Sequence, residues 1–252
     1  MGTITNKQLV KYARGQLGRP YWYSCFGQRA TRELYAEVAK RYPSQIYKWP
    51  KDTYMAQLGH KVHDCSGLIK GACYCNGDPE GVPKFDSAID FSANGMIEAC
   101  TVQGDFDTIP EVPGLLVWKS GHVGVFVQTL ADGKKLVYEA KGHMYGVCAT
   151  TETKWKKWGK LPFIKYDTDP EGDTCMVELA ILKRGMKDTN GPVTSWQGLL
   201  RLYGYTDDSG AEIKLDGSYG PKTEQATKKV QKKHGLTVTG VVNSAEWHAI
   251  IM

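Results

Sequence analysis

The chain changes abruptly from a polar run to an apolar helical pattern at residue 65. A polar run from His60 to Asp64 ends at a cysteine, and apolar side chains then follow at helical spacing: Leu68, Ile69, Ala72 and Cys73. Aspartate is a preferred helix cap, so the pattern predicts a helix that begins at Cys65. Unpaired amide groups and the positive end of the helix dipole favour a thiolate at such a position. The stretch therefore predicts a nucleophilic cysteine.

A second change of pattern supplies a base for this cysteine. His122 begins an apolar, β-branched run over residues 122–127, and a similar run over residues 135–140 follows an Ala-Asp-Gly turn. If the two strands pair as a hairpin, Glu139 lies beside His122 and its carboxylate holds the imidazole in one tautomer. His143 is the alternative orienting residue, but its place in a loop after Gly142 favours Glu139. Nucleophile, base and orienting group form a known catalytic arrangement.

The remaining patterns are mostly helical. Residues 5–17 predict an amphipathic helix capped by Thr5 or Asn6, and residues 31–42 predict a second helix. The latter belongs to an insertion over residues 27–63, which we expect either to wall one side of the active-site groove or to cover an edge of the core. A short helix is expected within residues 88–96. Near the end of the chain, residues 193–203, residues 221–234 and a segment capped by Ser244 predict three more helices.

The N-terminal motifs resemble those of a known enzyme family. Asp-Cys-Ser-Gly-Leu at 64–68, followed by Gly-His-Val-Gly-Val at 121–125, resembles the NlpC-type cell-wall cysteine peptidases, which have a papain-like fold. Gly-Arg-Pro-Tyr-Trp-Tyr at 18–23 is similar to that family's Gly-x-Pro-Tyr-x-Trp segment. Residues 113–118 are similar to its Pro-Gly-Asp-Leu-Val segment, with Leu115 in place of the acid. The resemblance implies that Cys65 is the nucleophile, His122 the base and Glu139 the third polar residue, where the family more often has histidine.

Three further residues are assigned to substrate binding. Tyr21 occupies the family's substrate-site tyrosine, although packing in the core is the alternative for an aromatic residue there. Ser66 follows the nucleophile directly. Trp155 belongs to a tryptophan pair that would form a sugar-stacking platform if exposed, whereas packing on the sheet is the commoner role of such a residue.

The C-terminal motifs resemble a second family. A Gln-Gly-Leu-Leu segment at 197–200, an Asp-Gly-x-Tyr-Gly turn at 216–220 and a Val-Gln pair at 230–231 are similar to the three-helix peptidoglycan-binding domain. By this resemblance we assign wall binding to Asp216, Gly217, Tyr219 and Trp247. A helical dimerisation module is the alternative, but it does not explain the Asp-Gly-x-Tyr-Gly turn.

These readings give an α+β protein in two parts. We expect a papain-like, NlpC-type catalytic domain over residues 1–167, and a small all-α peptidoglycan-binding domain over residues 176–252. The linker between them, residues 168–175, lies in a polar stretch rich in turn-forming residues.

Composition adds an expectation about location. A hydrophobic content of 41% and a charged content of 23% are ordinary for a soluble protein, and the net charge of +5 suits either an anionic cell wall or a surface with spare lysines. Seven cysteines without regular spacing predict free thiols in a reducing cytosol. We see no secretory signal and no run of about 18 apolar residues. We therefore expect an endolysin of a phage or prophage, made in the host cytoplasm and reaching the wall after membrane permeabilisation; an autolysin exported by another route is the competitor.

The predicted function is hydrolysis of peptidoglycan at the D-γ-glutamyl–diamino acid bond of the stem peptide. An amidase that cuts before L-alanine would use the same thiol, and a wall-binding protein without catalysis is a further alternative. His60, His63, Cys65, Cys73 and Cys75 would suit zinc only if they folded together. We expect no cofactor, no membrane insertion and a monomer. The lysines at 228, 229, 232 and 233 predict a solvated helix face rather than a nucleic-acid site.

Overall fold

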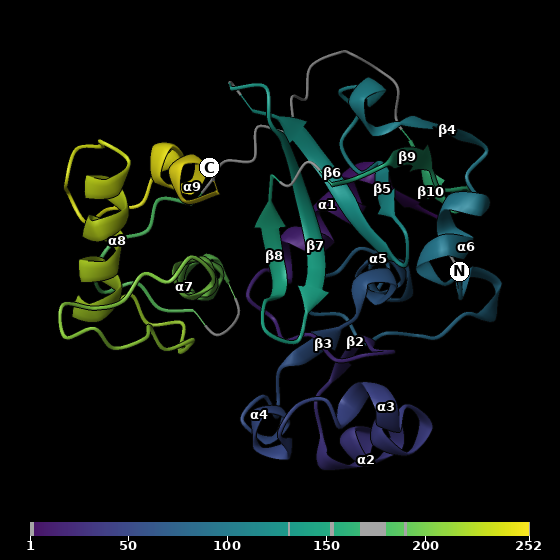
Figure 1. Ribbon diagram of the computed structural model, residues 1–252, viewed down its shortest axis with the longest axis horizontal. Helices are drawn as coiled ribbons and strands as arrows, with labels where there is room; N and C mark the ends of the chain where they lie inside the picture. The colour runs from purple at the N-terminus through teal and green to yellow at the C-terminus, as the bar shows by residue number, and fades with distance from the viewer. Residues whose placement is uncertain (1–2, 131, 152–153, 167–179, 189–190, 252) are drawn as a thin grey trace.

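The computed structural model of the protein describes residues 3–130, 132–151, 154–166, 180–188 and 191–251. Figure 1 shows a larger α+β region beside a smaller helical one. The predicted linker, residues 168–175, lies outside the described residues, as do the neighbouring ends of the two predicted domains. No helix in the described ranges is long and apolar enough to cross a membrane.

A six-stranded antiparallel sheet forms the centre of the N-terminal region. The strand order is β4-β9-β5-β6-β7-β8. Four strands are short and two, β6 and β7, span eight residues each, as the hairpin pattern predicts. The bounds in sheet order are Val102–Asp105, Lys157–Lys160, Leu116–Lys119, His122–Thr129, Lys135–Gly142 and Gly146–Thr150.

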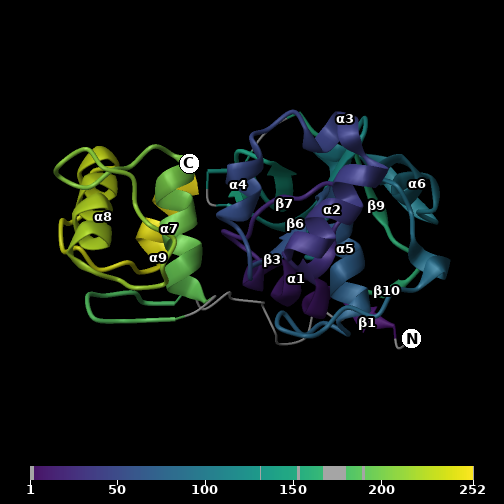
Figure 2. The same cartoon turned by 90° about the horizontal axis from the view of Figure 1, so that it is seen from below.

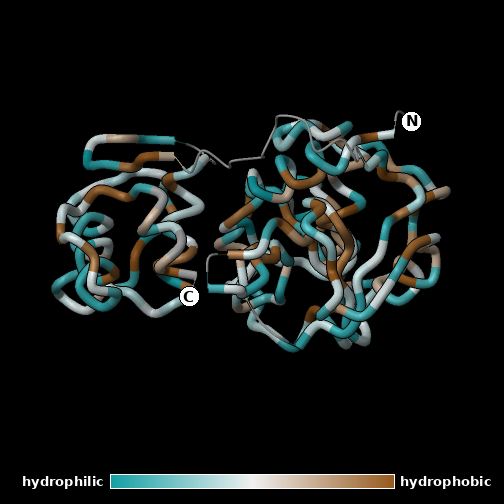
Figure 3. Tube along the Cα trace, turned by 90° about the horizontal axis from the view of Figure 1, so that it is seen from above, coloured by the Kyte–Doolittle hydropathy of each residue, from teal (hydrophilic) through white to brown (hydrophobic). Residues whose placement is uncertain are grey.

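Two helices cover one face of this sheet. Helix α1 (Asn6–Gly15) and helix α5 (Cys65–Tyr74) lie side by side and pack against β6 and β7 (Figure 2). Thr5 caps α1 through a capping box with Gln8, and the buried face of α1 includes Leu9 and Val10. Their apolar side chains join those of α5 and the sheet in one core. The apolar segments in Figure 3 run mostly through the middle of each of the two regions.

Helix α5 is pressed closely against the neighbouring strand β2 (Phe26–Arg29). A side chain at Gly67 would place its Cβ 1.9 Å from the carbonyl oxygen of Cys25, and one at Gly71 would lie 2.7 Å from that of Phe26. Only glycine permits this approach of backbone to helix. The consequence is that the first two turns of α5 are fixed against the segment that carries Tyr21.

The predicted insertion folds into three helices with a small core of its own. Thr31 caps the first of them, as the pattern predicts. Apolar residues that include Trp22, Val38 and Tyr54 form this separate core. The helices are α2 (Arg32–Arg41), α3 (Pro43–Ile46) and α4 (Lys51–Met55), and the insertion ends in β3 (Lys61–His63), which pairs with β2.

Shorter elements complete the N-terminal region. The expected helix within residues 88–96 is two pieces, a 3-10 turn and the helix α6. A second 3-10 turn follows β4, and a two-stranded parallel pair, β1 with β10, joins the two ends of the region. Their bounds are Ser87–Ile89, Ala93–Glu98, Phe106–Thr108, Ile4–Thr5 and Ile164–Lys165.

The C-terminal region contains the three predicted helices, α7 (Pro192–Leu202), α8 (Pro221–Lys233) and α9 (Ser244–Ile251). It touches the N-terminal region through α7 and β8. A Cβ added at Gly198 of α7 would lie 2.9 Å from the Cα of Gly18, and the Ser195 hydroxyl donates a hydrogen bond to the carbonyl of Leu17 at 3.2 Å. The two regions therefore meet backbone to backbone.

Candidate active site and wall-binding domain

Cys65 is the first residue of α5, as predicted, and Asp64 is its N-cap. One carboxylate oxygen of Asp64 accepts the Gly67 amide at 2.6 Å, and the other accepts the Ser24 amide at 2.8 Å. The backbone amides of Val123 and Ser66 lie close enough to the Cys65 sulfur to lower the pKa of the thiol. Val123 is the second residue of β6, so the thiol lies at the beginning of the strand that carries the predicted base.

The sequence-based expectation of a thiolate at Cys65 is not met in this state. Burial and, to a smaller extent, the nearby carboxylate of Asp64 raise the pKa of the Cys65 thiol to about 12, even though the Val123 and Ser66 amides lower it. The helix start favours charge on the sulfur, but the loss of hydration is the larger effect here. The thiol is therefore neutral and needs a base to become a nucleophile.

His122 and Glu139 lie together, as the hairpin register predicts. The His122 Nε2 is 2.6 Å from the Glu139 Oε2, and the His122 side chain is 16% exposed whereas the Glu139 side chain is fully buried. The Thr150 hydroxyl of β8 donates a hydrogen bond to the second carboxylate oxygen. Because Nε2 is engaged by Glu139, Nδ1 is the ring nitrogen that remains for a second partner.

Trp155 does not form the open platform expected of a sugar-binding residue. Its side chain is only 5% exposed, and its ring stacks on the His122 imidazole with centroids 5.5 Å apart. The Lys119 ammonium lies 4.8 Å from the centre of the Trp155 ring. Because Trp155 is buried against His122, its ring fixes the plane of the imidazole and is not open for stacking on a sugar.

Tyr21 lies in the surroundings of Cys65, whereas the hydroxyl of Ser66 is turned to the helix cap. Burial raises the pKa of Tyr21 most, and Asp64 and Cys65 add to this effect. Ser66 is 6% exposed, and its hydroxyl donates to Asp64 Oδ1 at 3.1 Å. The assignment of Ser66 to substrate binding is corrected accordingly: its amide contacts the sulfur and its side chain supports the helix cap.

His143 contacts the insertion instead of the base. Its Nε2 is 2.9 Å from the Thr53 hydroxyl, and its ring stacks on Trp49 at 5.0 Å and tilts against Tyr54 at 4.5 Å. These contacts tie the β7–β8 turn to α4. They leave Glu139 as the orienting group beside His122.

Two contributors to this site were not anticipated from the sequence. Val123 was recognised only as part of an apolar strand, because the sequence does not show where a backbone amide points. Thr150 is a polar residue at the end of the otherwise apolar strand β8, which was a usable signal. Its partner could not be identified without the register of β7 and β8.

The alternative zinc ligands do not converge. Within the described ranges no group of three or more histidine, cysteine or acidic residues is placed to hold a metal. His63 is fully buried, with its Nε2 3.0 Å from the Tyr12 hydroxyl, and burial together with the charge of Lys61 lowers the pKa of His63 to about 3. Six cysteines in the described part of the chain are free thiols.

In the C-terminal region, Tyr219 and Trp247 are core residues rather than exposed wall contacts. Tyr219 is 1% exposed and its hydroxyl donates to the Gly240 carbonyl at 2.8 Å. Trp247 is 5% exposed, packs edge to face on Trp196 at 5.0 Å and donates to the Ala180 carbonyl at 2.9 Å. The assignment of both side chains to wall binding is corrected, because both are buried in the core of the domain.

Asp216 and Gly217 serve the turn before α8. The Gln197 side chain donates to Asp216 Oδ1 at 2.9 Å and accepts the Gly217 amide at 2.9 Å. Gly217 has a positive φ of 65°, and a side chain there would meet the Asp188 carbonyl oxygen at 1.8 Å. These two residues therefore hold the turn in shape, which explains the motif without a direct contact to the wall.

Comparison with known proteins bears on this second region. Residues 189–250 match the family model described as "Putative peptidoglycan binding domain". No curated protein and no solved structure matches the chain. The matched residues include α7, α8 and nearly all of α9. Residues 189–250 thus form a peptidoglycan-binding domain, which supports peptidoglycan as a binding partner of the protein.

Proposed function

We propose that the protein is a peptidoglycan hydrolase in which Cys65 and His122 cleave an amide bond of the stem peptide, between D-γ-glutamate and the diamino acid. The observation that carries the proposal is the imidazole of His122, which a buried carboxylate holds at 2.6 Å and which lies on the same strand as Val123, whose amide acts on the Cys65 sulfur. The resemblance to the NlpC-type peptidases indicates which bond is cleaved. The peptidoglycan-binding domain indicates that the substrate is peptidoglycan.

The chemistry follows from the neutral thiol. His122 removes the proton of Cys65 as the sulfur attacks the amide carbonyl carbon, so a carbon–sulfur bond forms and the carbonyl oxygen becomes an oxyanion. The amides at the start of α5 are donors for this oxyanion, and one such donor contributes about 3 kcal/mol in comparable sites. The imidazolium then delivers its proton to the leaving amine as the carbon–nitrogen bond breaks.

The second half of the cycle releases the enzyme. Water gives a proton to His122 and attacks the thioester, and the sulfur leaves with a proton from the imidazolium. Glu139 stabilises the positively charged ring in both halves of the cycle. Because it is fully buried, its charge acts with little screening by water.

The test separates lysis from attachment. Cys65→Ala in the full chain should abolish the fall in turbidity of purified wall but leave co-sedimentation with the wall intact. Cys73→Ala is a matched control, because it makes the same change in the same helix away from the helix start. Lysis by Cys65→Ala would refute Cys65 as the nucleophile, whereas absence of lysis by both the wild-type chain and the control would leave the protein with a wall-binding role alone.

The bond is tested on the products. Mass spectrometry of muropeptides released by the wild-type chain should reveal new free amino groups on the diamino acid. New amino groups on L-alanine would identify an amidase with the same thiol instead.

A further inference from the structure

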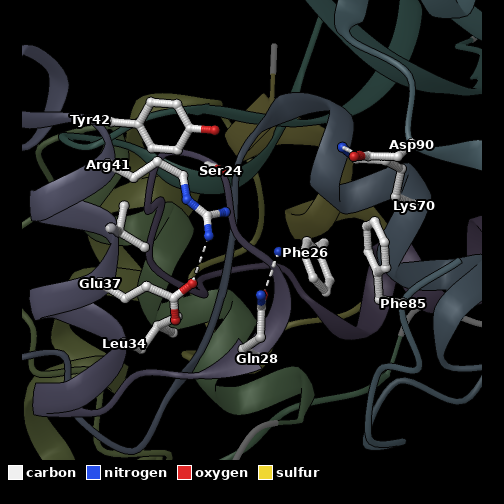
Figure 4. Close-up of a pocket in the computed structure, with 11 residues that line it drawn as sticks. Ser24, Phe26, Gln28, Leu34, Glu37, Arg41, Tyr42, Lys70, Phe85 and Asp90 are labelled. Carbon is white, nitrogen blue, oxygen red and sulfur yellow. Dashed lines mark hydrogen bonds and ion pairs between the residues drawn. The ribbon is translucent and has the colours of Figure 1, made fainter. Parts of the chain in front are cut away.

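A pocket of about 340 Å³ lies between α2 of the insertion and the side of α5 (Figure 4). Its volume is in the range of small-ligand sites. Leu34 and Tyr42 line it from the α2 side, and Phe26 and Phe85 form an aromatic wall opposite. Phe85 is 57% exposed, so a large apolar surface next to the pocket is left without cover.

The pocket borders elements that also carry Cys65 and its helix cap. Lys70 of the pocket is five residues after Cys65 on the same helix, which is about 7.5 Å along the helix axis. Ser24 lines the pocket and its amide is bonded to the Asp64 carboxylate. On the α2 side, Tyr42 packs edge to face on Tyr23 with ring centroids 5.1 Å apart.

Tyr23 completes this connection. Burial raises the pKa of Tyr23 most, and Asp64, Tyr42 and Cys65 each add to this effect, while the Tyr23 ring packs on that of Tyr42. On the proposed function, a peptide bound at Cys65 can extend past Tyr23 toward the pocket.

Charges of both signs stand on opposite walls of the pocket. Arg41 and Glu37 form an i,i+4 pair at 3.1 Å on α2, with side chains 62% and 61% exposed. Lys70 and Asp90 form a pair at 2.7 Å on the other wall, where Asp90 is 45% exposed. An exposed helix pair contributes only about 0.3–0.5 kcal/mol. Arg41 can consequently leave Glu37 for a ligand carboxylate, which its planar guanidinium matches with two hydrogen bonds.

We propose that this pocket is a specificity site for a zwitterionic part of the wall peptide, with its carboxylate on Arg41, its ammonium on Asp90 and its aliphatic chain against Phe26 and Phe85. The two cations and two anions on the walls sum to zero charge, which fits a ligand that carries one charge of each sign. The substrate class rests on the proposed function. A diamino acid at the end of a stem peptide has this chemistry, because it carries a free amine and a free carboxylate joined by methylene groups.

Binding to an inert chain tests the site without turnover. The probe is a stem tripeptide that ends in the diamino acid, titrated calorimetrically into the full-length Cys65→Ala chain. Arg41→Gln in that background should weaken binding by about tenfold or more, as expected for the loss of a hydrogen bond to a charged group. Lys40→Gln, the same change one residue earlier on an exposed position of α2, should leave binding unchanged.

The chemical specificity is tested with a second probe. The same peptide with its terminal carboxylate converted to an amide should bind more weakly to the parent chain and should respond equally to Arg41→Gln and Lys40→Gln. Asp90→Asn should weaken binding of the peptide with a free side-chain amine but not of the N-acetylated peptide. Equal binding by the Arg41→Gln and Lys40→Gln chains with the free peptide would overturn the proposal.

Failure of the pocket proposal and failure of the proposed hydrolase function give different results. If the wild-type chain lyses wall and the two charge variants bind the peptide as the parent does, the pocket proposal alone is wrong. If the binding pattern appears but the wild-type chain releases no products from wall, the hydrolase proposal is wrong and the peptide site stands.

Discussion

Replacing Glu139 by glutamine removes the negative charge beside His122 and keeps the shape of the side chain. The amide oxygen of glutamine can still accept from His122 Nε2, and its amino group can donate to the Thr150 hydroxyl. Both contacts of the carboxylate are therefore replaced by neutral ones. The change isolates the contribution of charge from that of geometry.

The size of the effect follows from burial. Glu139 is fully buried, so its interaction with a protonated imidazole has the strength of a hydrogen bond to a charged group, about 1.5–3 kcal/mol. With 1.36 kcal/mol for each factor of ten, kcat/KM should fall by about tenfold to about 150-fold. KM should change little, because Glu139 is buried behind the base and does not reach a substrate.

The assay is the initial rate of amine release from purified wall. Glu111→Gln is a matched control, because it makes the same change at an exposed position and should retain the wild-type rate. Circular dichroism and thermal unfolding of Glu139→Gln show whether the fold survives. A folded Glu139→Gln chain with the turnover of the control would refute the assignment of Glu139 as the group that stabilises the charged base.

Three further predictions concern His143 and the buried thiols. His143→Gln should change kcat by less than about threefold, because the His143 ring contacts the insertion; a loss as large as that of the glutamate variant would transfer the orienting role to it. Burial raises the pKa of Cys73 and of Cys100 to about 12, whereas thiols in an unfolded chain titrate near 8.5. Above pH 8.5 the unfolded state therefore binds fewer protons than the folded state, and each buried thiol should lower the free energy of unfolding in urea by about 1.4 kcal/mol per pH unit. The loss of stability should be smaller in Cys73→Ala. Equal stability at pH 8 and pH 10 would contradict this prediction. Alkylation of Cys65 by iodoacetamide, followed by mass spectrometry, should accelerate about tenfold per pH unit from pH 7 to pH 9, whereas a plateau below pH 8 would indicate a preformed thiolate.

Local pattern was sufficient to predict the elements that carry the candidate site. The helix at Cys65 and its cap, and the hairpin that brings Glu139 to His122, depend on short-range signals: a capping residue, an apolar periodicity and a tight turn. These signals act within about twenty residues of chain. They place two of the catalytic candidates beside one another without knowledge of the whole fold.

What depends on distant pairing could not be predicted. Strand β9 lies between β4 and β5, although about 40 residues separate it from β5 in the chain. For the same reason the sequence could not show that Cys65 is partly buried against the core, which outweighs the effect of the helix start on the pKa of its thiol. The roles expected of Trp155 and Tyr219 were wrong because the sequence gives the type of a side chain but not the direction in which it points.

The meeting of Gly18 with Gly198 determines how the two ends of the protein cooperate. With no side chain between the two backbones, α7 rests directly on the loop that leads to Tyr21, and Tyr203 adds a hydrogen bond to the carbonyl of Ala149. If the proposed function is correct, peptidoglycan bound by the C-terminal domain is presented to Cys65 at one distance and one angle, and a longer connection between the regions would not extend the reach of the thiol. Gly198→Leu would separate the regions and make their relative orientation variable.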